Sequence, residues 1–296
     1  MNSQLSRYNS IDWSRLAEPQ EDQYDTDVTL ELAASTTSPA RPALYVRTPV
    51  GNATAAFDGH VAVRHVYGTL PGFDAMLTNH HCTDAPGDHP NIGKAAEHIR
   101  TWPVAFTQCQ RLLEAIHPVH YPELPLESDE IYRGSLSHSY EHLFGTLWAT
   151  IYCPIGLAES IVHEMAHQKL RVLGASFESA TNIVGNDPSE LYVSPVIKDR
   201  LRPMTAVLHA QYSFVYVTAL DVHMLAAEHN PLRREVLGQV LQSNLSRIEE
   251  GYATIQEHFK PAEHGEEFLD GFSSWIERTI SSAKGLLARG SPVKAG

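Results

Sequence analysis

Residues 157–174 read LAESIVHEMAHQKLRVLG, and the rest of the chain is interpreted around them. Apolar residues cover most of the helical circumference, no proline interrupts them, and Gly174 follows as a stop signal, so the stretch predicts a largely buried helix. His163 and His167 lie one turn apart on that helix and project from one face. With Glu164 they form an H-E-x-x-H pattern, which can bring two imidazoles to one metal ion. The alternative is a pair of hydrogen-bonded core histidines, and we favour the metal site.

Composition limits the class of protein. The chain has 296 residues, of which 43% are hydrophobic and 19% charged, which is typical of a globular protein with a substantial core. A net charge of −13 without any basic block argues against nucleic-acid binding. The apolar runs are too short to span a bilayer, and the N-terminus has no hydrophobic signal core. Three scattered cysteines, Cys82, Cys109 and Cys153, indicate reduced thiols. We therefore expect a cytoplasmic protein without a membrane partner; the sequence does not predict its oligomeric state.

Hydrophobic spacing predicts a mainly α fold with minor β structure. Helical patterns occupy residues 94–117, 203–229, 231–259 and 263–289, and β-branched and aromatic residues predict a strand at 144–153, before the motif helix. Residues 27–34 fit either a strand or a helix. Residues 51–93, which include His80–Cys82, are expected to be mainly loop. Residues 135–142, in which His138 and His142 lie four apart, are expected to form a surface turn. We expect an irregular segment at 1–93, with a possible role in leader recognition, and one helical catalytic domain at 94–296.

A metal bound by His163 and His167 needs a third ligand. Leu170 and Leu173 stand where the metzincin pattern requires Gly and His, which excludes that class of peptidase. Glu178 could act as a downstream carboxylate ligand, but it lies in a short polar connection typical of the surface. His209 lies in AVLHAQYSFVYV, a strongly apolar helical stretch, and is the better candidate. Taken alone, His209 would be interpreted as a core histidine.

Two blocks of sequence resemble a known family. LAESIVHEMAHQKL (157–170) and ELYVSPVIKDRLRPMTAVLHAQYSFVYV (190–217), with the spacing between them, resemble the H-E-x-x-H-containing peptide-modification family of ribosomal peptide natural-product pathways. The resemblance covers residues 144–222 and extends more weakly into the C-terminal helices. It implies an Fe(II)-dependent dioxygenase that uses 2-oxoglutarate as co-substrate and O₂ to β-hydroxylate a residue of a precursor peptide.

The resemblance also implies roles for individual residues. His163, His167 and His209 would be the iron ligands. Glu164 would be a further ligand, an acceptor behind a histidine, or a base, and the sequence does not choose among these.

A bidentate arginine is the natural anchor for the far carboxylate of 2-oxoglutarate. Arg202 occupies the R-P position of the second block, with Arg200 two residues before it. Tyr192 and Tyr212 are candidates for lining the same pocket.

Two other functions remain open from the residues alone. The first is a zinc metallopeptidase in which Glu164 activates a zinc-bound water. The second is a non-catalytic scaffold or peptide-binding protein in which the histidines are structural. The third ligand discriminates in part, because a peptidase of the gluzincin type would depend on Glu178 and a dioxygenase on His209.

Overall fold

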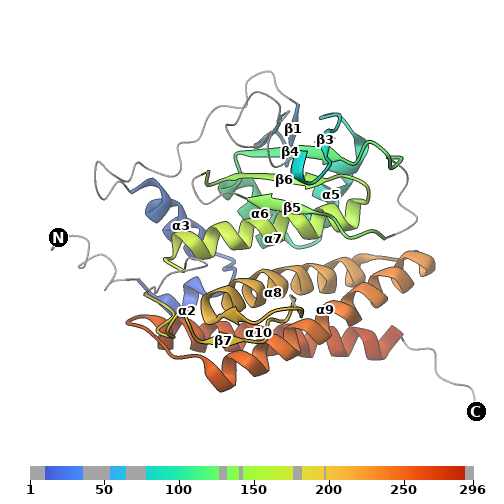
Figure 1. Ribbon diagram of the computed structural model, residues 1–296. Coiled ribbons are helices and arrows are strands. Elements are labelled where there is room, and N and C mark those ends of the chain that lie inside the picture. The colour runs from blue at the N-terminus through green and yellow to red at the C-terminus, as the bar shows by residue number, and fades with distance from the viewer. Residues whose placement is uncertain are drawn as a thin grey trace, which may run out of the picture.

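The motif helix α7 (Pro154–Val172) lies between a sheet layer and a layer of long helices (Figure 1). The computed structural model describes residues 11–35, 54–64, 78–126, 132–139, 143–175, 182–196 and 198–290. Of these residues 58% are helical and 12% lie in strands, which confirms the mainly α fold with minor β structure. Fifteen of the nineteen residues of α7 are buried, so the prediction of a buried helix is also confirmed.

The sheet layer is mixed and has the order β1-β2-β4-β6-β5. Its centre consists of β2 (Val61–Val63), β4 (Ala115–His120) and β6 (Thr146–Thr150), which pair in parallel. At its two ends lie β1 (Ala55–Ala56), antiparallel to β2, and β5 (Ser137–Ser139), antiparallel to β6; β3 (Thr83–Asp84) pairs with β4. All five residues of β6 are buried, and the strand expected at 144–153 is confirmed.

Two helices accompany α7 beneath the sheet. These are α5 (Pro90–Arg100) and α6 (Pro103–Leu112), each of which begins with a proline whose fixed φ suits the first turn. The helical pattern expected to continue to residue 117 is wrong beyond α6, because Ala115 opens β4. Five of the six residues of β4 are buried, and a strand covered on both faces has no alternation to distinguish it from a helix.

The second layer consists of three long helices, as expected. They are α8 (Met204–Ala227), α9 (Pro231–His258) and α10 (Gly265–Gly290). The short antiparallel pair β7 (Leu191–Tyr192) and β8 (Arg202–Pro203) precedes α8. Helix α2 (Trp13–Leu16) packs on α10 so closely that a Cβ on Gly271 would lie 2.1 Å from the carbonyl oxygen of Ser14.

The described N-terminal residues belong to the same folded body as the rest. Helix α3 (Tyr24–Ala34) settles the choice left open at 27–34, and it contacts both α6 and α7. The boundary expected between residues 93 and 94 falls inside α5, and strands from both sides of it join one sheet. Within the described part of residues 1–93, the strands β1, β2 and β3 were not predicted because strands of two or three residues carry almost no periodic signal.

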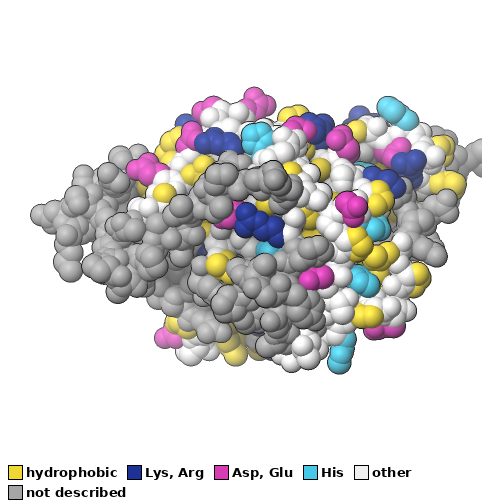
Figure 2. Space-filling view, turned by 90° about the horizontal axis from the view of Figure 1, so that it is seen from above, with side chains coloured by type: hydrophobic (Ala, Val, Ile, Leu, Met, Phe, Trp, Pro, Cys, Tyr) yellow, Lys and Arg dark blue, Asp and Glu magenta, His cyan; other side chains and the backbone are white. Residues whose placement is uncertain are grey.

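The surface above the sheet mixes acidic, basic and histidine side chains over its described area (Figure 2). Among the described residues, every helix is too short or too polar to cross a bilayer.

Candidate metal centre

The three histidines singled out in the sequence lie together between α7 and α8. The two helices run antiparallel and pack against each other, so that His167 faces His209 and His163 faces Phe214. The ring centroids of His163 and His167 are 4.4 Å apart, and those of His167 and His209 are 5.3 Å apart. His209 is fully buried, whereas the other two imidazoles are partly exposed.

The spacing of the first two imidazoles fits a shared metal ion. Nε2 of His163 lies 3.0 Å from Nε2 of His167. Two nitrogens bound at about 2.1 Å to one ion, at right angles, are about 3.0 Å apart. The pair therefore fits two adjacent positions of an octahedral ion.

His209 approaches from the other side of the His167 ring. Its Nδ1 lies 3.2 Å from Nδ1 of His167, while its Nε2 lies 2.6 Å from the carbonyl oxygen of Ala175. A carbonyl only accepts, so Nε2 of His209 carries the hydrogen and Nδ1 of a neutral ring accepts one from Nδ1 of His167. This tautomer leaves Nε2 of His167 with a lone pair directed toward His163. In this arrangement His209 orients a ligand and does not itself reach the ion that the Nε2 pair would share.

The turn after α7 places the carbonyl of Ala175. Gly174 adopts φ +98°. The N–H of Ala175 donates to the carbonyl of Leu170, and the N–H of Gly174 donates to the carbonyl of Arg171. These are the two bonds of a Schellman motif, for which glycine is preferred because the left-handed conformation strains other residues. Gly174, expected as a helix stop, therefore also positions the acceptor for His209.

The surroundings keep all three imidazoles neutral at neutral pH. Burial lowers the pKa of His209 to about 3, with the charge of Arg171 acting in the same direction. Burial also lowers the pKa of His163, and burial together with the neighbouring histidines holds the pKa of His167 well below its usual range. Neutral imidazoles are the form that binds metals.

Glu164 is held by the strand β5. Ser137 Oγ donates to one carboxylate oxygen at 2.8 Å, and Ser139 Oγ donates to the other at 2.7 Å. The Glu164 side chain is buried. Sequence interpretation missed both serines, because 135–142 was expected to be a surface turn. Their alternation, which puts residues i and i+2 on one face of a strand, was the available signal.

Arg171 is the second residue that the sequence interpretation missed. It lies one turn beyond His167, and its Nη1 donates to the carbonyl and the hydroxyl oxygen of Ser139 at 3.3 and 3.2 Å. Its charge also acts on His167 and His209. A guanidinium therefore borders the histidine cluster.

The expected co-substrate residues lie apart from these contacts. Arg202 is half-buried in β8, where its backbone pairs with that of Tyr192, and Arg200 is exposed. The Tyr192 hydroxyl bonds to Asn186 and to Glu190. Glu178 and His142 lie outside the described residues.

Tyr212 points away from the metal centre, into the aromatic core. Its ring packs against Tyr216, Phe272 and Trp275, with centroids 5.4 to 5.9 Å away, and it is fully buried. Burial raises the pKa of its hydroxyl. It therefore belongs to the core rather than to a pocket that opens at the histidines.

The remaining histidine and cysteine candidates form no comparable cluster. His80 and His138 are exposed, and their rings lie 6.0 and 6.2 Å from the buried ring of Trp148. All three cysteines are buried and unpaired. As the side chains stand, the described residues contain no group of three or more His, Cys, Asp or Glu side chains able to hold a metal ion.

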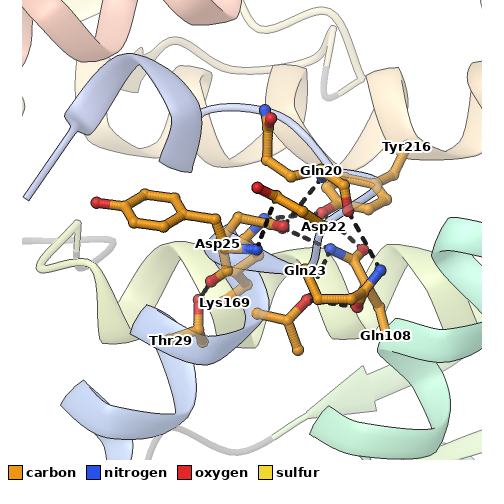
Figure 3. A network of polar contacts seen from close by, with 10 residues as sticks. Gln20, Asp22, Gln23, Asp25, Thr29, Gln108, Lys169 and Tyr216 are labelled. Atoms are coloured by element: carbon orange, nitrogen blue, oxygen red, sulfur yellow. Dashed lines mark hydrogen bonds and ion pairs between the residues drawn. The ribbon is translucent and has the colours of Figure 1, made fainter.

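Two residues beyond His167, a buried ion pair joins α7 to the N-terminal helix α3 (Figure 3). Lys169 of α7 pairs with Asp25 of α3, and both side chains are fully buried. Lys169 Nζ also lies 3.1 Å from the Tyr216 hydroxyl, which donates to Gln108, and Gln108 Nε2 donates to Asp25 at 2.5 Å. Burial alone would lower the pKa of Lys169, but the charge of Asp25, together with Tyr212 and the hydrogen bond to Asp25, raises this pKa overall.

A second buried group contains two carboxyls, Glu159 of α7 and Asp221 of α8. Asn244 Nδ2 bridges them, at 2.8 Å from Asp221 and 3.3 Å from Glu159, and the Tyr132 hydroxyl donates to Glu159 at 2.6 Å. Burial raises the pKa of both carboxyls, and their mutual repulsion raises that of Asp221 further.

A cavity of about 730 Å³ lies far from the histidine cluster. Its lining includes Trp102, His223, Trp275 and Arg278. His223 is fourteen residues beyond His209 on α8, roughly 21 Å along the helix. The cavity and the histidine cluster therefore lie in different parts of the molecule.

Comparison of the chain with models of known protein families and with curated protein sequences gave no match.

Proposed function

We propose that the protein is an Fe(II)- and 2-oxoglutarate-dependent dioxygenase that β-hydroxylates a residue of a ribosomally synthesised precursor peptide. The observation that carries the proposal is the 3.0 Å separation of the Nε2 atoms of His163 and His167, in rings that burial keeps neutral. The resemblance of residues 157–170 and 190–217 to the peptide-modification family supplies the reaction. Three unpaired cysteines support a cytoplasmic location.

In this proposal each residue of the cluster has a separate role. Bound iron, with the 2-oxo acid and O₂, would supply the oxidising power that breaks a C–H bond. His163 and His167 would hold this iron through Nε2. His209 keeps the hydrogen of His167 on Nδ1, so that Nε2 of that ring stays available. Glu164 fixes β5 against α7 through the two serine hydroxyls.

Arg171 joins Arg202 as a candidate anchor for the far carboxylate of 2-oxoglutarate. Arg171 borders the histidine cluster, and its Nη1 already donates to two oxygen atoms of Ser139. A guanidinium recognises a carboxylate by two parallel hydrogen bonds, which an ammonium cannot reproduce. We expect Arg171→Lys to weaken 2-oxoglutarate binding by about tenfold or more, as loss of one charge-assisted bond requires. Arg202→Lys is the matched variant. If only Arg202→Lys weakens 2-oxoglutarate binding, Arg202 is the anchor for the far carboxylate.

The test is an anaerobic titration followed by turnover. Fe(II) and then 2-oxoglutarate are added to the purified protein, and we expect a visible charge-transfer band that appears only when both are bound. His163→Ala should abolish the band. Exposure to O₂ should then yield succinate, and with a precursor peptide a product heavier by one oxygen atom.

The competing function is the zinc peptidase, in which Glu164 would be the general base. Both carboxylate oxygens of Glu164 accept hydrogen bonds from serine hydroxyls, which favours a holding role. Cleavage of the peptide with Zn(II) bound, and no oxygen incorporation with iron, would refute the dioxygenase proposal.

A further inference from the structure

The strand β5 lies at the end of the sheet, beside the metal centre. It is the strand drawn nearest to α7 and to the layer of long helices (Figure 1). Within the described part of the chain it pairs with β6 on one side only. An edge strand with unpaired backbone groups is a template for another extended chain.

Pairing with β6 determines which backbone groups of β5 face outward. The N–H of Thr150 bonds to the carbonyl of Leu136, and Leu136 stands opposite Thr150 in the register set by Ser137 and Ala149. Hydrogen-bonded positions alternate in an antiparallel pair, so His138 is the next residue bonded to β6. The N–H and C=O groups of Ser137 and Ser139 therefore point away from β6.

Of these outward groups, the N–H and C=O of Ser137 form no hydrogen bond with any other described residue, so they offer a complete pair. The carbonyl of Ser139 already accepts from Arg171 Nη1 at 3.3 Å. A residue of an antiparallel partner placed opposite Ser137 would exchange two hydrogen bonds with it.

The edge is fixed along α7 by several contacts. A Cβ on Gly156 would lie 2.3 Å from the carbonyl oxygen of Arg133, so the segment before β5 rests directly on the first turn of α7. The Tyr132 hydroxyl bonds to Glu159, and the Ser137 hydroxyl bonds to Glu164, next to His163. An added strand would lie roughly 4.8 Å from β5, which brings its residues alongside the metal-binding turn of α7.

We propose that the peptide substrate binds as an extra, antiparallel strand on β5, paired through the backbone of Ser137. This inference rests on the proposed function for the identity of the bound peptide as substrate. Recognition through backbone groups gives affinity with little dependence on sequence, and side chains at alternate positions supply specificity. It also explains why Glu164 and two serines hold a three-residue strand so firmly.

The test compares two variants at one position. A peptide selected from a phage-displayed library of random dodecapeptides for binding to the metal-free wild-type protein is synthesised with a fluorescent label as probe. Ser137→Ala and Ser137→Pro both lose the hydroxyl bonded to Glu164, but only proline loses the N–H. Proline is tolerated at an edge position whose N–H faces outward. We expect Ser137→Pro to weaken binding about tenfold or more relative to Ser137→Ala, measured by fluorescence anisotropy.

A second measurement removes the dependence on the variant folding. Single N-methyl groups are introduced along the probe, and methylation of an amide opposite Ser137 should reduce binding to wild-type protein as strongly as the proline does, with methylation at its neighbours tolerated. Equal binding by the two variants, no sensitive amide, or no selected binder would each overturn the proposal. The binding measurements contain no iron or 2-oxoglutarate, so they do not depend on whether the protein oxidises a peptide. Failure of strand pairing can therefore be distinguished from failure of the proposed dioxygenase function.

Discussion

The buried pair of Asp25 and Lys169 makes a quantitative prediction about how α3 supports the motif helix α7. Lys169→Met removes the cation and leaves the Asp25 carboxylate buried, with hydrogen bonds from Gln108 and the N–H of Gln20 as partial compensation. Breaking one side of a buried ion pair costs about 3–5 kcal/mol, because the remaining charge is uncompensated. For a domain of this size that corresponds to a fall in Tm of roughly 6–20 °C.

The double variant distinguishes pairing from simple loss of packing. Asp25→Asn with Lys169→Met replaces two charges by neutral groups of similar volume, and this should recover most of the loss, to within about 1–2 kcal/mol of wild type. The free energies of unfolding would be measured by urea titration, with fluorescence and circular dichroism followed together to check for a two-state transition. A cost below about 1 kcal/mol for Lys169→Met, or additive costs in the double variant, would refute the reasoning.

Three further predictions follow from other contacts. Folding raises the pKa of the Asp221 carboxyl, so the stability that this group contributes is present below pH about 4 and is lost as the pH rises. Asp221→Asn should reduce this loss of stability. Its urea midpoint should therefore change less between pH 5 and pH 8 than that of the wild type. If His209 orients a ligand, His209→Phe should weaken Co(II) binding by about 10- to 100-fold, whereas His163→Ala should abolish it; equal loss in both variants would make His209 a direct ligand. Gly271→Ala should lower Tm, because its Cβ would clash with a backbone carbonyl of α2. Gly285→Ala, also in α10, would place its Cβ in ordinary contact with Arg289 Nη2 at 4.0 Å and should raise stability by about 0.5–1 kcal/mol. A similar response of the two glycines would contradict the close packing of α2.

The sequence predicted the parts of the molecule whose signals are long and periodic. The motif helix of nineteen residues, the three longer C-terminal helices and the association of His209 with the H-E-x-x-H pair all depend on extended helical spacing. The sheet was harder to predict, because its strands are short and β4 is buried on both faces. Its hydrophobic run was therefore read as the end of a helix.

The sequence could name candidate ligands but not the direction in which they point. His209 was expected to bind metal, but in the structure its Nδ1 faces Nδ1 of His167. This orientation depends on the bond from His209 to the carbonyl of Ala175, which the turn at Gly174 places. Arg171 and the two serines come into place through tertiary contacts between α7 and an edge strand. Contacts of that kind leave no pattern within either segment.

The docking of α2 on α10 has a consequence for the folding of the chain. The Trp13 N–H bonds to Glu267, 254 residues away, and the Trp13 ring stacks on His264 at 4.6 Å. Contacts of such large sequence separation close late, since the entropy of a long loop must be overcome first. During synthesis on the ribosome, α2 would be made before α10, its packing partner. Trp13 and its neighbours would remain exposed until α10 is synthesised. The chain should therefore fold only after α10 emerges, and a permutant that joins α10 directly to α2 should refold faster than the natural order.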